Sequence, residues 1–83
     1  MPFDVRYWRT SGQVEVDFVI DCKHHVIPVE CKYATRPDRH QLAHLHRFLE
    51  REPRAPLGVV IYRGDFRYDA ATRVIYFPVW AMV

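Results

Sequence analysis

Several features that define specialised classes of protein are scarce or missing in the sequence. Its 83 residues hold two cysteines, Cys22 and Cys31, too few for the disulfide framework of a small secreted domain. We therefore expect reduced thiols and a cytoplasmic protein. No apolar run approaches the ~20 residues of a membrane span, and the N-terminus lacks the basic start and apolar stretch of a signal peptide. The formal net charge is only +2, which by itself does not indicate a nucleic-acid partner.

What the sequence does contain is the composition of a small globular domain. Hydrophobic residues make up 49% of the chain and charged residues 27%, which is too apolar for a disordered segment. By the scaling of surface with mass, such a chain buries roughly 64% of its unfolded surface. That is enough for one core, so we expect a single domain over residues 1–83, without linker or repeat.

Hydrophobic periodicity predicts five strands and one helix. Alternation with period two predicts strands at 5–10, 14–20, 26–33, 57–62 and 73–79. The helix follows a capping box at 35–38, with a competing cap formed by Asp38 and Gln41, and it stops at Pro53. Its apolar stripe comprises Leu42, Leu45, Phe48 and Leu49. The order is β-β-β-α-β-β, and the helix makes a parallel crossover between the third and fourth strands plausible.

The strands at 14–20 and 26–33 together place acidic groups on one face of a hairpin. If their apolar sets share a face and a four-residue loop joins them, paired residue numbers add to 47. Asp17 then lies opposite Glu30, and Glu15 opposite Lys32, with Cβ atoms ~4.5–5.5 Å apart. Opposed carboxylates destabilise an ordinary sheet, and Mg²⁺ or Mn²⁺ would offset the repulsion. A nearby lysine could hold the attacking water or stabilise transition-state charge. A solvated face on which Glu15 pairs with Lys32 explains the spacing equally well.

These residues resemble the D…(D/E)-x-K signature of the PD-(D/E)XK nuclease superfamily, with Asp17 followed thirteen residues later by Glu30-Cys31-Lys32. A longer likeness, from about Phe3 to Trp80, joins the segments 7–10, 12–19, 27–33, 45–49 and 59–64. In these segments the chain resembles the C-terminal domain of unknown function that many bacterial and archaeal AAA+-type ATPases carry.

The resemblance implies an α/β, restriction-endonuclease-like mixed β-sheet in which Asp17 and Glu30 bind a metal and Lys32 is the catalytic lysine. Glu15 would be an accessory ligand or would orient Lys32. It further implies a DNA or RNA substrate. The usual first helix of the superfamily is missing, and no Gly-x-x-x-x-Gly-Lys-Ser/Thr motif is present. We therefore expect a fragment or remnant of a larger ATPase-linked protein.

Other polar groups have plainer interpretations. Four arginines lie on the helix or before it: Arg36, Arg39, Arg47 and Arg51. They could contact a phosphate backbone, although a solvated basic face is the commoner outcome. His40 and His44 have a zinc-binding spacing but no third ligand with a fixed place, and Cys22 with His24 and His25 fits a polar turn. Gln41 could orient a water or substrate, but capping explains it as well or better.

Two functions follow as hypotheses. The first is a Mg²⁺- or Mn²⁺-dependent nuclease that hydrolyses nucleic-acid phosphodiesters. The second is a catalytically inactive module that docks protein or DNA beside an AAA+ ATPase. Apolar termini and the missing helix would leave an open hydrophobic surface, which a partner or a second copy usually covers, so we also expect a homodimer.

Overall fold

The computed structural model describes residues 4–9 and 15–82, with side chains for residues 18–81. In these residues the strands form one mixed sheet in the order β1-β2-β3-β4-β6-β5. The elements are β1 (Asp4–Arg9), β2 (Glu15–Cys22), β3 (His25–Cys31), α1 (Ala43–Arg51), β4 (Gly58–Tyr62), β5 (Arg67–Asp69), β6 (Val74–Pro78) and the 3₁₀ turn η1 (Val79–Met82). Within the same ranges, no helix is long and apolar enough to cross a membrane.

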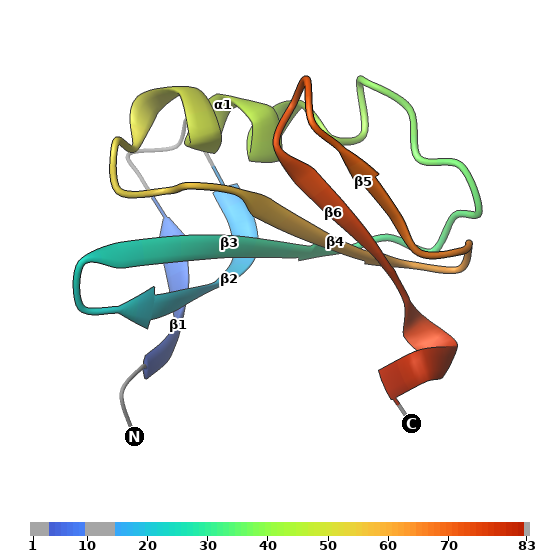
Figure 1. Cartoon of the computed structure of the whole chain (residues 1–83), viewed down its shortest axis with the longest axis horizontal. Coiled ribbons are helices and arrows are strands. Elements are labelled where there is room, and N and C mark those ends of the chain that lie inside the picture. Colours follow the sequence, from blue (N-terminus) through green and yellow to red (C-terminus); the bar gives the residue numbers. More distant parts are fainter. Residues whose placement is uncertain (1–3, 10–14, 83) are drawn as a thin grey trace.

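The predicted fold class, a mixed α/β domain in this order, is confirmed. β1, β2 and β3 are antiparallel, and β3 pairs in parallel with β4 after the crossover through α1. β4 in turn runs parallel to β6. The three-residue strand β5, antiparallel to β6 at the sheet edge, was not predicted. Figure 1 shows α1 lying on one side of the sheet, with η1 at the C-terminal end of β6.

Helix α1 forms where the apolar stripe predicted it. Its N-cap residue, Leu42, makes no side-chain capping hydrogen bond, and the predicted cap lies in the turn that leads into the helix. Asp38 and Gln41 cap each other: the Gln41 backbone N–H donates to Asp38 Oδ1, and the Asp38 N–H donates to Gln41 Oε1, both at 2.9 Å. This is the competing cap of the sequence analysis. At the other end Glu52 has extended backbone, as the residue before a proline prefers, and Pro53 ends the helix.

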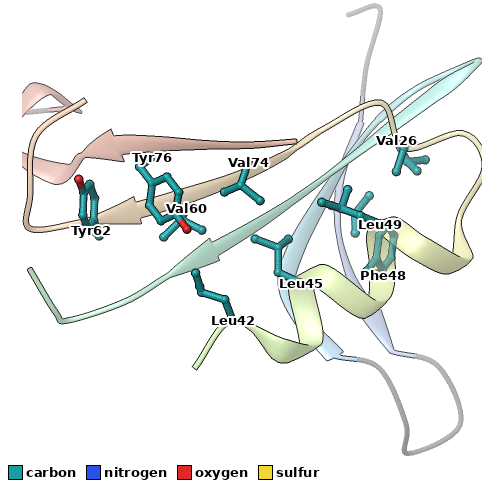
Figure 2. Close-up of a cluster of buried hydrophobic side chains, with 11 residues drawn as sticks. Val26, Leu42, Leu45, Phe48, Leu49, Val60, Tyr62, Val74 and Tyr76 are labelled. Atoms are coloured by element: carbon teal, nitrogen blue, oxygen red, sulfur yellow. The ribbon is translucent and has the colours of Figure 1, made fainter. Parts of the chain in front are cut away.

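The main core lies between α1 and one face of the sheet. Leu42, Leu45, Phe48 and Leu49 point from the helix side towards the strands (Figure 2). The sheet meets them with side chains that alternate along each strand: Val19 from β2, Val26 from β3, Val60 and Tyr62 from β4, and Val74 and Tyr76 from β6. Gly58 permits the close approach, because a Cβ there would lie 3.0 Å from Leu45 Cδ1.

The opposite face of the sheet is also apolar, and we call it the second sheet face. It is formed by the intervening side chains of three central strands: Ile27, Val29, Val59, Ile61, Ile75 and Phe77. All but Val29 are half-buried, and none belongs to the cluster under α1. The prediction that the apolar sets of β2 and β3 share a face is therefore confirmed, but α1 packs on the other face. Cys31, at the end of β3, is exposed.

Candidate active site

The β2–β3 register is the one that the sequence predicts. Phe18 pairs with Val29 and Ile20 with Ile27, so paired residue numbers add to 47. The strands reach further than expected, and the connecting turn is only Lys23-His24, since Cys22 still pairs with His25. Lys23 takes a positive φ of 68°, and its N–H donates to Asp21 Oδ1 at 3.2 Å. The register is unchanged because shortening a symmetric loop by one residue at each end preserves the pairing.

This register determines which backbone positions meet at the candidate site. Continued by one residue beyond the Phe18–Val29 pair, it places position 17 opposite Glu30. Position 15 pairs with Arg9 of β1, while Lys32 follows the end of β3. The side chains of Asp17 and Glu15 lie outside the described set. The convergence of the Asp17 and Glu30 carboxylates on a metal therefore stays a prediction. It rests on the backbone pairing of β2 with β3.

Glu30 itself is well positioned by the sheet. It lies on β3 between β2 and β4, with its backbone paired to Val60 in the parallel ladder, and only 5% of the residue is exposed. The interpretation of this face as open to solvent is wrong for Glu30, because α1 covers the face to which it belongs. A carboxylate placed on a helix-covered sheet face is costly to desolvate, so it requires charged or polar partners.

Lys32 provides the positive charge beside Glu30. Its Nζ lies 3.9 Å from Glu30 Oε2, and its side chain is 29% exposed against 6% for Glu30. The Lys32 N–H donates to the Ile61 carbonyl at 2.9 Å, which ties the residue to β4. The pair therefore has one end in the protein interior and the other in contact with water.

The predicted arginines divide into separate surfaces. Arg39 and Arg47 line a groove of about 510 Å³ between α1 and the β5–β6 turn, together with His46, Thr72 and Arg73. Arg36 lines a different hollow beside Tyr62 and Phe66, and Arg51 is exposed in the last helical turn. No lining residue of the groove belongs to β2 or β3, so the groove and the Glu30–Lys32 pair are distinct features.

The remaining candidates, Gln41, His40 and His44, do not gather into a site. Gln41 serves the cap, since its Oε1 accepts from the Asp38 N–H and its own backbone N–H donates to Asp38 Oδ1. His40 and His44 are exposed on and before α1. Among the residues that the structure describes, no three His, Cys, Asp or Glu side chains come together as a metal-binding group.

Arg73 is a residue that sequence reasoning missed. Its guanidinium donates to the carbonyls of Leu49 and Ala55, at 3.0 and 2.9 Å, and so joins the end of α1 to the following loop. A positive φ of 62° at Arg73 directs the chain from the turn into β6. No signal in the sequence separates this arginine from the others, because its partners are backbone carbonyls distant along the chain.

Two carboxyl groups outside the candidate site have perturbed pKa values. The backbone N–H of Arg54, and then its guanidinium, hold the pKa of Glu52 below its ordinary value. The Thr72 side chain chiefly lowers the pKa of Asp69. Both groups stabilise turns on either side of the groove and are not placed to act on a ligand at Glu30.

Fold and site together define a small mixed α/β domain with one helix on its sheet and an interior carboxylate–lysine pair on the central strand. Residues 1–82 match the family model described as "Domain of unknown function (DUF4143)", and the chain belongs to this family. No curated protein and no solved structure shows significant similarity to it.

Proposed function

We propose that the chain is a metal-dependent nuclease-like domain of the PD-(D/E)XK type, acting on DNA or RNA phosphodiesters. The observation that carries the proposal is the Glu30–Lys32 pair, 3.9 Å apart with Glu30 only 5% exposed. The β2–β3 register, continued by one residue beyond Phe18–Val29, would set Asp17 opposite Glu30. A charged side chain in the interior of a sheet is typical of functional sites.

Each residue then has a chemical role. Asp17 and Glu30 would hold Mg²⁺ or Mn²⁺, which binds one or two carboxylates together with water and phosphate oxygens. When bound, such an ion would supply Lewis-acid chemistry, lowering the pKa of a bound water and stabilising charge on the phosphate. Lys32 positions that water or neutralises the developing charge. Glu15 serves as an accessory ligand or orients Lys32.

The groove between α1 and the β5–β6 turn supports a nucleic-acid partner. Three arginines line it against a single carboxylate, that of Glu50. Guanidinium groups bind phosphate oxygens with a planar fork. Because Arg73 is engaged by backbone carbonyls, Arg39 and Arg47 would make the contacts. Such contacts would hold a strand by its backbone, without reading its sequence.

A metal titration followed by an activity assay tests the proposal. Addition of Ca²⁺ or Mn²⁺ should shift or broaden the amide signals of Asp17, Glu30 and Lys32 before others. Hydrolysis of single- and double-stranded substrates should fall on the order of 10²- to 10³-fold in Asp17→Asn, Glu30→Gln and Lys32→Met, but not in Asp65→Asn, an exposed control between β4 and β5 and outside the groove. Activity equal in the wild type and Asp17→Asn would indicate a contaminating nuclease and contradict the proposal.

The second candidate function is an inactive docking module beside an AAA+ ATPase. The second sheet face favours it, since side chains such as Ile61 and Phe77 are only half-buried there and accessible apolar surface is typical of protein contact. The two functions separate in the same titration: a folded chain whose Asp17 and Glu30 signals do not respond to millimolar metal supports docking alone.

A further inference from the structure

A hollow of about 420 Å³ lies at the carboxyl ends of the parallel strands β3 and β4. Its lining combines two cations, an aromatic ring, a thiol and two aliphatic side chains: Cys31, Lys32, Tyr33, Ile61, Arg63 and Val79. No carboxylate of the described residues is part of this lining. Ligands of open α/β sheets bind at the carboxyl ends of the strands, and the volume of this hollow is within the range of ligand pockets.

Tyr33 and Arg63 are held beside each other in the lining of the hollow. The Lys32 N–H donates to the Ile61 carbonyl at 2.9 Å, and the Arg63 N–H donates to the Ala34 carbonyl at 3.1 Å. These two bonds extend the pairing of β3 with β4 beyond the ends of the strands. Arg63 Cζ lies over the Tyr33 ring, 6.0 Å from its centroid. The ring and the guanidinium are thus in place before any ligand arrives, which lowers the cost of binding one.

The chemistry of this lining suits a nucleotide with an unpaired base. Tyr33 is 94% exposed, so its ring contributes little to the core and can be covered by a ligand. Bases of single strands stack on such rings, while guanidinium groups bind the phosphates beside them. In a duplex the faces of the bases are already stacked on one another, so the ring has no base to receive.

We propose that this hollow, which we call the stacking pocket, binds an unpaired base of a single-stranded nucleic acid. The base stacks on Tyr33, and Arg63 binds the adjoining phosphate. Lys32 lines the stacking pocket, and its Nζ lies 3.9 Å from Glu30 Oε2, so the pocket adjoins the candidate active site. Resting on the proposed function, the inference names the substrate class of that site as nucleic acid with an unpaired segment.

Fluorescence anisotropy of end-labelled oligonucleotides tests the proposal, with EDTA present so that binding is measured without metal-dependent hydrolysis. A single strand of roughly 12 nucleotides should bind about 10-fold more tightly than an abasic strand of equal length, which carries the phosphates without the bases. Tyr33→Leu should weaken binding of the single strand roughly 5- to 100-fold, as for the loss of one stacked base. Tyr33→Trp keeps a ring and should bind like wild type, and so should Tyr68→Leu, which removes a 52% exposed tyrosine on β5 outside the pocket.

Alkylation by iodoacetamide, read at each cysteine by mass spectrometry, locates the contact. Cys31 is exposed and lines the stacking pocket, whereas Cys22 lies beside the β2–β3 turn, at the other end of the hairpin. The single strand should slow the reaction of Cys31 in proportion to the fraction of chains bound and leave that of Cys22 unchanged. A duplex of the same sequence should protect neither.

Absence of binding by the single strand, equal binding of the abasic strand, a bound strand that leaves Cys31 unprotected, or wild-type affinity in Tyr33→Leu would each overturn the proposal. Hydrolysis that depends on Glu30 but binding that does not depend on Tyr33 would remove the stacking pocket and leave the proposed function. Binding that depends on Tyr33 without any hydrolysis would support the stacking pocket and contradict the proposed function.

Discussion

The ion pair at the candidate site has an energetic asymmetry that two substitutions can measure. At a separation of 3.9 Å between Lys32 Nζ and Glu30 Oε2, Coulomb's law gives about 4 kcal/mol at an effective dielectric constant of 20 and about 1 kcal/mol in water. Lys32 is partly solvated, which places the attraction towards the lower value. Desolvating the carboxylate costs several kcal/mol, so the pair contributes little net stability.

We therefore expect the two ends of the pair to respond differently. Glu30→Gln removes the attraction and the desolvation cost together, and the free energy of unfolding should stay within about 1 kcal/mol of wild type. Lys32→Met removes the attraction alone and leaves the carboxylate in the interior, so we expect a loss of about 1–2 kcal/mol. The double variant should resemble Glu30→Gln, which gives a coupling energy of the same size as the Lys32→Met loss.

Urea unfolding followed by circular dichroism measures these free energies, with Glu50→Gln as an exposed control. Mg²⁺ at ten times its dissociation constant should add about 1.4 kcal/mol to the wild type and nothing to Glu30→Gln. A Glu30→Gln loss equal to or larger than that of Lys32→Met would refute the reasoning. The carboxylate would then be a structural stabiliser, and its burial would no longer indicate a site.

Two further predictions concern the packing of α1 and the loop that follows it. Gly58→Val should destabilise the chain by about 1–3 kcal/mol through overpacking, because a Cβ would already lie 3.0 and 3.3 Å from Leu45 and Leu49 methyl groups; Gly58→Ala should cost less in the same urea experiment, and equal stability of Gly58→Val and wild type would contradict the close approach. The lowered pKa of Glu52 stabilises the fold above the ordinary carboxyl value, and this contribution is lost as the pH falls through the folded-state pKa. Stability of Glu52→Gln should therefore decline less steeply on acidification, and parallel curves for variant and wild type would contradict it.

The sequence predicts well the elements that are fixed by local signals or by the alternation of side chains between the two faces of the sheet. Matching apolar faces restricts the β2–β3 pairing to alternate registers, and the observed one follows from the short connection between the strands. The stripe Leu42, Leu45, Phe48 and Leu49 and the stop at Pro53 likewise leave little freedom to α1. Strand β5 was missed because its three residues, Arg67–Asp69, are too short for a periodicity and form only against β6.

The side of the sheet that α1 covers could not be predicted by the same reasoning. On β2 the charges at 15 and 17 mark one face as polar, but β4 and β6 are apolar on both faces and therefore assign no side. The helix packs where Gly58 lets it approach β4 most closely and where Tyr62 and Tyr76 extend the core, which is the face of Glu30. The charges on β2 would leave this face to solvent, but the packing of α1 on β4 and β6 covers it. The carboxylate that this packing encloses, Glu30, is the one that the sequence analysis assigns to chemistry on other grounds. Charged groups in the interior concentrate at functional sites, because activity, and not stability, maintains them.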